Sequence, residues 1–220
     1  MANPMRTGPL LVRVVALGDS LTVGFQSYGF NADVQRSTPY TDFLHALAKG
    51  DSQLSSLSVE IINKGVNGDL TEQMLARFDF DVVCLSPAIV IILGGSNDLG
   101  LGLPPREVFL NLREMYELSL GKGITPIACA VPSILGFDAG IPPRLTLNEL
   151  IGEYSSKRGL RCADLFRATK DRDARLALQY SSDGLHLNTE GYRKVADTIY
   201  EEALRPLLRV VGAGLPNRIK

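Results

Sequence analysis

Four short groups of residues in this chain of 220 amino acids combine side chains that can carry out chemistry together. They contain a serine hydroxyl, an imidazole with a carboxylate three residues before it, and amide donors. An activated hydroxyl can attack a carbonyl carbon, and amide groups can stabilise the oxyanion that the attack creates. The groups therefore hold the parts needed for acyl-transfer catalysis. They read Gly18-Asp19-Ser20-Leu21, Asn67-Gly68-Asp69, Gly94-Gly95-Ser96-Asn97-Asp98 and Asp183-Gly184-Leu185-His186.

Histidine is scarce in this sequence, which narrows the choice of a general base. The two histidines are His45 and His186. His45 lies among apolar residues of a predicted helix, a pattern typical of a helix surface or boundary. His186 follows Asp183 by three residues, close enough in a tight turn for the carboxylate to orient the ring. An unperturbed imidazole titrates near ~6.5 and can accept and return a proton at neutral pH. Two histidines also argue against a His-based metal site.

The elements that must position these groups follow from the apolar pattern of the chain. Five short apolar runs predict β-strands, and helical patterns separate them. This repeated order is typical of a doubly wound α/β sheet, whose ligands bind at the carboxyl ends of the strands. Three of the four groups directly follow predicted strands, so they should converge on one rim of the sheet. The strands are expected over residues 11–17, 58–63, 88–93, 124–131 and 160–163.

Capping signals place the helices between these strands. Thr38 is expected to cap a helix that has Pro39 at its first position. Asp69 with Glu72 three residues later resembles a capping box, and Asn188 is expected to cap the last helix. The helices are predicted over residues 39–49, 69–78, 104–121, 145–157 and 189–204.

In this order and at these strand positions, the four groups closely resemble the motif blocks of the SGNH, or GDSL, family of serine esterases and lipases. The resemblance runs from Gly18 to about Tyr192. It implies an α/β fold, a flavodoxin-like three-layer α/β/α arrangement with a five-stranded parallel sheet. It also implies a single domain over residues 1–220, with a core from about 10 to 205 and short tails.

The same resemblance assigns roles to individual residues. It makes Ser20 the nucleophile, His186 the general base and Asp183 the residue that orients the imidazole. The oxyanion hole would consist of the backbone N–H groups of Ser20 and Gly68 and the side-chain amide of Asn97. Leu187 stands where many members have Pro, a difference that touches no catalytic atom. No metal and no cofactor are implied.

The serines allow two other interpretations. Ser96 is a rival nucleophile, but the role of the neighbouring Asn97 makes it a loop residue. The nucleophile elbow of α/β-hydrolases needs a second glycine, and Thr22 stands in its place after Ser20. The α/β-hydrolase fold is therefore disfavoured.

Nucleotide and nucleic-acid binding are also disfavoured. The spacing of Gly95 and Gly100 is that of a phosphate-binding loop, but Leu101 and Gly102 occupy the places of its Lys and Ser or Thr. No GxGxxG motif follows a strand, which argues against a dinucleotide site. The formal charge is 23 − 24 = −1, without the basic excess of a nucleic-acid binder.

The cysteines and the apolar runs bear on the compartment. Cys84, Cys129 and Cys162 are odd in number, share no CxxC spacing and lie in or beside apolar runs, so buried reduced thiols are expected. The first 20 residues lack the long apolar region and cleavage site of a signal peptide. No run approaches the ~18 apolar residues of a membrane span. A cytoplasmic protein without a membrane span is expected.

Our interpretation is a serine hydrolase that cleaves a small-molecule acyl ester through an acyl-enzyme intermediate. The alternatives on the same site are O-deacetylation of a sugar or metabolite and acyl transfer to an alcohol. A non-catalytic binding module is the alternative from another class. Phe25, Tyr28 and Phe30 either line an acyl pocket or pack a loop, and the Pro- and Gly-rich stretch 132–144 could be a mobile flap. The substrate and the oligomeric state are left open.

Overall fold

A single parallel sheet organises the structure, a computed structural model that describes residues 8–27, 37–181 and 183–214. The sheet has five strands in the order β2-β1-β3-β4-β5, and every neighbouring pair is parallel. The predicted α/β class and strand number are confirmed. The strands are β1 (Leu10–Gly18), β2 (Leu57–Gly65), β3 (Ile89–Leu93), β4 (Thr125–Ala130) and β5 (Arg161–Asp164).

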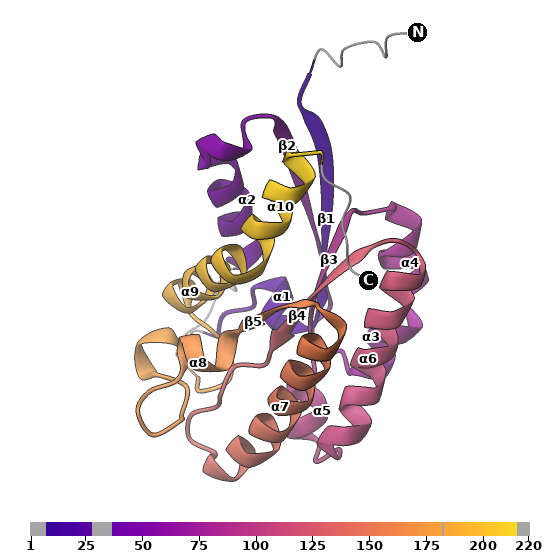
Figure 1. Cartoon of the computed structure of the whole chain (residues 1–220). Helices are drawn as coiled ribbons and strands as arrows, with labels where there is room; N and C mark the ends of the chain where they lie inside the picture. Colours follow the sequence, from indigo (N-terminus) through magenta and orange to yellow (C-terminus); the bar gives the residue numbers. More distant parts are fainter. Residues whose placement is uncertain (1–7, 28–36, 182, 215–220) are drawn as a thin grey trace, which may run out of the picture.

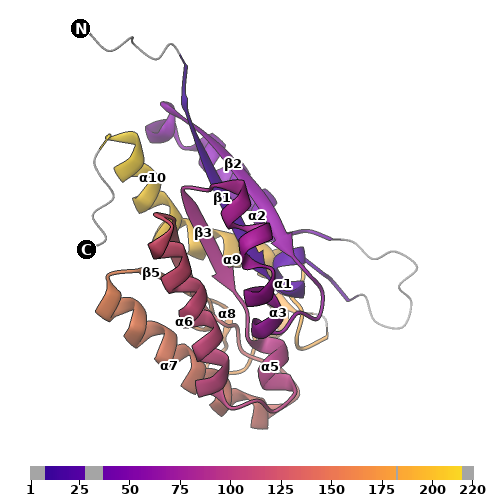
Figure 2. The same ribbon diagram turned by 90° about the vertical axis from the view of Figure 1, so that its right-hand side faces the viewer.

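Helices cover both faces of this sheet, which gives the three layers expected from the sequence (Figures 1 and 2). The helices α2, α8 and α9 pack on one face, and α3, α6 and α7 pack on the other. The longer helices are α2 (Tyr40–Gly50), α6 (Pro105–Gly121), α7 (Ile141–Arg158), α9 (Thr189–Ile199) and α10 (Arg205–Gly212). The shorter ones are α1 (Ser20–Val23), α3 (Thr71–Ala76), α4 (Phe78–Asp81), α5 (Ser96–Gly100) and α8 (Leu165–Thr169).

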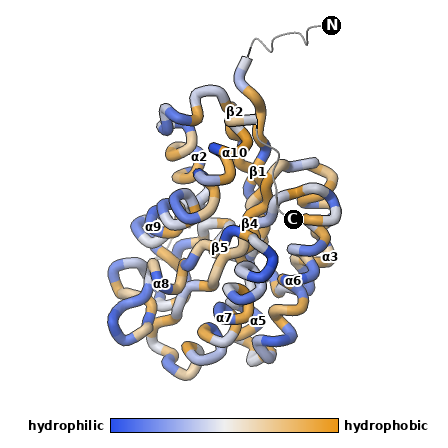
Figure 3. The backbone as a smooth tube through the Cα atoms, in the orientation of Figure 1, coloured by the Kyte–Doolittle hydropathy of each residue, from blue (hydrophilic) through white to orange (hydrophobic). Residues whose placement is uncertain are grey.

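The hydrophobic core lies against the middle of the sheet. Every residue of β3 and β4 is buried, which fits strands that are covered on both faces. An apolar stripe on α6, formed by Val108, Leu112 and Met115, is also buried. Figure 3 shows the same division, with hydrophobic strands and helices that alternate between hydrophobic and hydrophilic residues. The sheet is therefore a rigid base for the loops at its carboxyl end.

Helix α2 begins one residue later than its capping signal predicts. Pro39 is the N-cap residue, with an extended backbone (φ −64°, ψ 143°), and Tyr40 is the first helical residue. The Thr38 hydroxyl is buried and has no hydrogen-bond partner among the described residues. The predicted Thr38 cap is thus wrong. His45 is exposed on this helix, as its sequence context indicates.

The predicted capping box of Asp69 and Glu72 at the start of α3 is wrong. The helix begins at Thr71, and the Gln73 side chain accepts the Leu70 N–H at 2.8 Å. The Asp69 carboxylate binds Arg77 instead. Asp69 therefore pairs with the residue that ends α3 and not with the N–H groups at the start of the helix.

The connection between β4 and α7 is shorter than predicted. Helix α7 already begins at Ile141 and carries two prolines in its first turn, where the missing N–H groups need no helical partner. Hydrogen bonds connect the segment before α7 to the loops between α8 and α9. The Leu135 N–H binds the Gly184 carbonyl at 2.8 Å, and Ser133 Oγ binds the Ala174 carbonyl at 2.5 Å. The predicted loop over residues 141–144 is wrong.

The three cysteines are free thiols, but they are not all buried. Cys129 is buried and Cys162 is partly buried, whereas Cys84 is exposed, so the prediction of a buried thiol is wrong for Cys84. Burial raises the pKa of the Cys162 thiol to about 11, which keeps it protonated at neutral pH. Within the described ranges, no helix has both the length and the apolar character that crossing a membrane requires.

The C-terminal helices begin as predicted at Asn188. Its Oδ1 accepts the Gly191 N–H at 3.0 Å, and its Nδ2 donates to the Gln179 carbonyl at 2.9 Å. Pro206 does not end the helix. Instead, a wider π-helical turn over Tyr200–Leu204 joins α9 to α10, which accommodates a proline that has no N–H and crowds the carbonyl four residues earlier.

We expect Asn188→Ala to lower the free energy of unfolding by about 1–2 kcal/mol, because both the helix cap and the bond to Gln179 disappear. Asn188→Asp is the matched control, since it keeps the cap oxygen and loses only the donor. Urea denaturation of the three proteins measures the difference. Equal losses in the two variants would show that the cap oxygen does not stabilise α9.

Candidate active site

The candidate nucleophile lies at the junction of β1 and α1. Ser20 is the first residue of α1, where the helix itself does not use the backbone N–H. The Asp19 carboxylate caps this short helix by accepting the Leu21 N–H at 2.9 Å. Gly18 permits the tight junction, since a Cβ there would lie 2.2 Å from Thr22 Oγ1. Strand end and cap together place the Ser20 side chain at the carboxyl end of the sheet.

The predicted pair of Asp183 and His186 forms within a single turn. Asp183 Oδ2 lies 2.7 Å from His186 Nδ1, and Asp183 Oδ1 accepts the backbone N–H groups of Leu185 and His186 at 2.9 and 2.7 Å. The turn requires Gly184, whose φ is +87° and whose Cβ would lie 2.4 Å from the Leu135 carbonyl oxygen. The carboxylate therefore fixes both the backbone and the ring of the histidine.

The charge of Asp183 decides which ring nitrogen of His186 carries the proton. Partial burial raises the pKa of this carboxyl, but the hydrogen bonds from the His186 ring and the backbone N–H groups outweigh it, so the pKa lies below its ordinary value. At neutral pH the group is thus a carboxylate that accepts a hydrogen bond from the Nδ1–H of His186. In the neutral imidazole, Nε2 is then the nitrogen that can act as a base.

Phe25 connects the candidate base to the candidate nucleophile. Its ring packs edge-on against the His186 imidazole, with centroids 4.6 Å apart, and its N–H binds the Ser20 carbonyl at 3.1 Å. The Phe25 carbonyl in turn accepts the Tyr192 hydroxyl of α9 at 2.6 Å. Of the two interpretations of Phe25, the structure shows packing against His186. Tyr28 and Phe30 lie outside the described residues.

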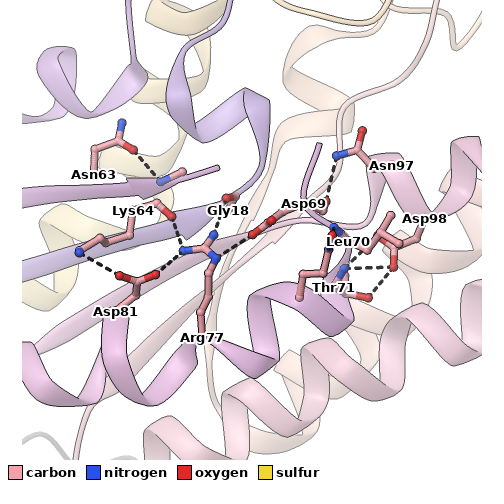
Figure 4. A network of polar contacts seen from close by, with 12 residues as sticks. Gly18, Asn63, Lys64, Asp69, Leu70, Thr71, Arg77, Asp81, Asn97 and Asp98 are labelled. Atoms are coloured by element: carbon pink, nitrogen blue, oxygen red, sulfur yellow. Dashed lines mark hydrogen bonds and ion pairs between the residues drawn. The ribbon is translucent and has the colours of Figure 1, made fainter. Parts of the chain in front are cut away.

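The two remaining candidate donors come from the loops after β2 and β3. Gly68 has φ +79°, a conformation that favours glycine, and nothing lies within 4 Å of the position of a Cβ. Asn97 Nδ2 donates one of its two protons to the Asp69 carbonyl at 2.9 Å, as Figure 4 shows. This bond fixes the amide and leaves its second N–H for another acceptor.

The Asp98 carboxylate has its partner on another helix. Asp98 accepts the Thr71 N–H at 3.1 Å and the Thr71 hydroxyl at 2.6 Å, so it caps α3 from the start of α5. Asn97 and Asp98 thus bind Asp69 and Thr71 side by side (Figure 4). The rival nucleophile Ser96 is the first residue of α5, directly before this pair.

Sequence reasoning missed Arg77. Its guanidinium binds the carboxylates of Asp69 and Asp81 and the carbonyls of Gly18 and Lys64, at 2.7–2.9 Å (Figure 4). Its partners come from two strands, a loop and helix α4, and only the pair with Asp81, four residues later, is local in the sequence.

No metal-binding cluster accompanies these groups. Among residues 8–27, 37–181 and 183–214, no set of three or more His, Cys, Asp or Glu side chains is arranged to hold a metal ion.

Asp19 is the most perturbed acid near Ser20. Burial raises its pKa to about 7, the Leu21 N–H opposes the rise, and the charges of Asp98 and Asp69 add to it. One of its oxygens, Oδ2, is buried with no partner among the described residues. The native state therefore favours the protonated form of Asp19 more than the unfolded chain does.

We expect Asp19→Asn to change the pH dependence of stability. Between pH 4 and 7 the native protein holds a proton on Asp19 that the unfolded chain has lost, so wild-type stability from this group falls as the pH rises. The variant lacks this loss, and its stability relative to wild type should rise by up to about 4 kcal/mol over that window and level off above pH 7. Urea denaturation at several pH values measures it, with the exposed Asp42→Asn as the control. Parallel curves for Asp19→Asn and wild type would contradict the raised pKa.

The chain is similar in sequence to known acylhydrolases. The model of the GDSL-like Lipase/Acylhydrolase family matches residues 16–194. An arylesterase of Vibrio mimicus is 31% identical over 111 residues, which make up 50% of this chain and 50% of that protein. The chain spans about half the length of the curated relatives that it matches.

Solved structures share the fold at lower identity. An acetylxylan esterase from Geobacillus stearothermophilus superimposes with a TM-score of 0.71 at 19% identity, covering 90% of this chain and 96% of that chain. A lipase/acylhydrolase from Enterococcus faecalis gives a TM-score of 0.68 at 23% identity, covering 95% of this chain and 98% of that chain. These likenesses concern the fold, whereas the family model spans most of the sequence. The chain belongs to the GDSL-like lipase/acylhydrolase family.

Proposed function

We propose that this protein is a serine hydrolase that cleaves carboxylic esters through an acyl-enzyme intermediate on Ser20. The observation that carries the proposal is the hydrogen bond of 2.7 Å between Asp183 Oδ2 and His186 Nδ1. It holds the imidazole against Phe25, whose N–H binds the Ser20 carbonyl. Membership of the acylhydrolase family supports the same chemistry.

In the first half of the reaction, Ser20 Oγ attacks the ester carbonyl carbon while His186 Nε2 takes the hydroxyl proton. The negative charge moves to the former carbonyl oxygen, which binds the N–H groups of Ser20 and Gly68 and the amide of Asn97. When this intermediate collapses, the bond to the alcohol breaks and His186 gives the alcohol its proton. The acyl group remains on Ser20.

In the second half, water takes the place of the alcohol. His186 removes a proton from the water as it attacks the acyl carbon, the same donors stabilise the second oxyanion, and the proton returns to Ser20 Oγ as the carboxylic acid leaves. The ionised Asp183 stabilises the imidazolium in both halves. Every step uses these side chains, the backbone N–H groups of Ser20 and Gly68, and water.

The substrate class that we propose is a small acyl ester, and the whole chain is proposed to act as a single domain over residues 1–220. One curated relative is named an arylesterase, and a structural neighbour is an acetylxylan esterase, so aryl and acetyl esters are the first substrates to test. The free thiols fit the reducing cytoplasm, where we propose that the protein acts.

We expect Ser20→Ala to lower kcat for p-nitrophenyl ester hydrolysis by about 10⁴-fold or more, because no other group can carry the acyl intermediate. Ser96→Ala, at the rival serine, should retain activity. Labelling with a serine-reactive phosphonate followed by peptide mapping should modify wild-type Ser20.

The outcomes of this experiment separate the alternatives. Undiminished turnover by Ser20→Ala would contradict the proposed mechanism. No turnover and no labelling of the wild-type protein would favour a binding module. Faster acyl release in the presence of an added alcohol, with formation of the new ester, would identify acyl transfer.

We expect Asn97→Ala to lower kcat by about 10²–10³-fold with little change in KM, since its amide binds an oxygen that becomes charged only during the reaction. Asn111→Ala is the matched control, because Asn111 Nδ2 donates to Thr71 Oγ1 in the same region at 3.0 Å without being a candidate oxyanion donor. Steady-state kinetics with p-nitrophenyl acetate measures both variants. A change confined to KM would argue against the assigned role of Asn97.

A further inference from the structure

We infer that Arg77 is a positioning residue that holds the Gly68 loop and the Ser20 turn in the geometry of one oxyanion hole. The inference rests on the proposed function, because it concerns the same reaction. Arg77 lies between α3 and α4, and its four hydrogen bonds go to none of the candidate catalytic side chains. It acts through the backbone segments that carry the donors.

The guanidinium makes four hydrogen bonds that spread in different directions (Figure 4). Nε donates to Asp69 Oδ2 at 2.7 Å, and Nη2 donates to the Gly18 carbonyl at 2.9 Å. Nη1 donates to the Lys64 carbonyl at 2.9 Å and to Asp81 Oδ2 at 2.8 Å. Three of the four acceptors thus belong to segments that lead directly into the site.

These acceptors lie on both sides of the loop that carries Gly68. Lys64 is near the end of β2 and Asp69 directly follows Gly68, so one cation anchors the loop at its start and at its finish. The Gly18 carbonyl ends β1 two residues before Ser20, and it also accepts the Val66 N–H of the same loop at 2.9 Å. A shift of the guanidinium would therefore move the two backbone donors relative to each other.

The contact between Arg77 and Asp69 also affects the third candidate donor, the Asn97 amide. The Asp69 carboxylate binds Arg77, while its backbone carbonyl holds Asn97 Nδ2 at 2.9 Å. The orientation of the Asn97 amide thus depends on a residue that Arg77 fixes. Each candidate oxyanion donor is thus close to an acceptor of Arg77. Gly68 directly precedes Asp69, Ser20 follows Gly18 by two residues, and Asn97 binds the Asp69 carbonyl.

Arginine suits this position better than lysine does. The planar guanidinium presents five N–H groups in a fixed fork, whereas an ammonium is a compact point charge. The side chain of Arg77 is 17% exposed, and those of Asp69 and Asp81 are 9% and 13% exposed. Lys64 Nζ pairs with Asp81 at 2.9 Å, so two cations balance two carboxylates. A lysine at position 77 would keep this balance but lose the simultaneous bonds.

The two carboxylates offer a matched pair of variants. Both carboxylates bind Arg77 at similar distances and are similarly buried. Asp69 directly follows the candidate donor Gly68, whereas Asp81 is the last residue of α4 and is adjacent to no candidate donor in the sequence. Asp69→Asn and Asp81→Asn each remove one negative charge without changing size. A merely structural role of Arg77 predicts similar effects of the two, and a positioning role predicts different effects on turnover.

The experiment measures kcat and KM for p-nitrophenyl acetate, and the inhibition constant of a trifluoromethyl ketone that mimics the oxyanion, at a temperature where every variant is folded. We expect Arg77→Lys and Asp69→Asn to lower kcat by about 10–100-fold, to change KM little and to weaken the ketone by a similar factor. Asp81→Asn should keep wild-type kcat. Arg205→Lys, which alters an ion pair with Asp51 remote from these segments, should also keep it.

Every outcome either supports or overturns the positioning role of Arg77. Wild-type kcat in both Arg77→Lys and Asp69→Asn, or equal losses in Asp69→Asn and Asp81→Asn, would overturn the inference while leaving the proposed function intact. If Arg77→Lys does not fold, the comparison of the two Asn variants still decides. A wild-type protein without esterase activity would overturn the proposed function, and the inference with it.

Discussion

The parallel register of three strands is the constraint on which the site depends. In the pairing of β1 with its neighbours, Gly18 lies opposite Gly65 of β2 and opposite Leu93 of β3, so the three strands end at the same level. The loops that follow therefore start from one plane, and residues 20, 68 and 97 can meet after only a few residues of loop. A slip of one residue would displace a strand by ~3.3 Å and turn its side chains to the other face.

Around this rim, aspartate side chains have different roles because their surroundings differ. Asp183 is an ionised partner of an imidazole, because hydrogen bonds outweigh its partial burial. Asp98 caps a neighbouring helix through Thr71. Asp19, fully enclosed beside Ser20, has its pKa raised to about 7. The environment therefore sets the charge that each carboxyl presents to the reaction.

The sequence was sufficient for the strands and for the four motif groups, because both are local patterns. Helix starts were harder, since long-range partners compete with local caps. Asp69 binds Arg77, the residue that ends α3, rather than the N–H groups at the start of that helix, and the extended backbone of Pro39 displaces the expected cap at Thr38. The prolines at the start of α7 favour a loop as well as a first helical turn, so their pattern alone does not place the helix start. Only the pair of Arg77 with Asp81 is local in the sequence, whereas the bonds to Gly18, Lys64 and Asp69 depend on the fold.

The two halves of the site are therefore built by different means. The candidate base and its carboxylate lie within one turn, Asp183 to His186, which requires Gly184 and its approach to the Leu135 carbonyl. The positions of the candidate nucleophile and of the candidate oxyanion donors depend on the sheet register and on contacts between distant segments. Phe25 joins the halves, because its N–H binds Ser20 and its ring packs on His186. Phe25 thus links the segments that carry the candidate nucleophile and the candidate base, and the Tyr192 hydroxyl fixes Phe25 to α9, the helix that follows His186.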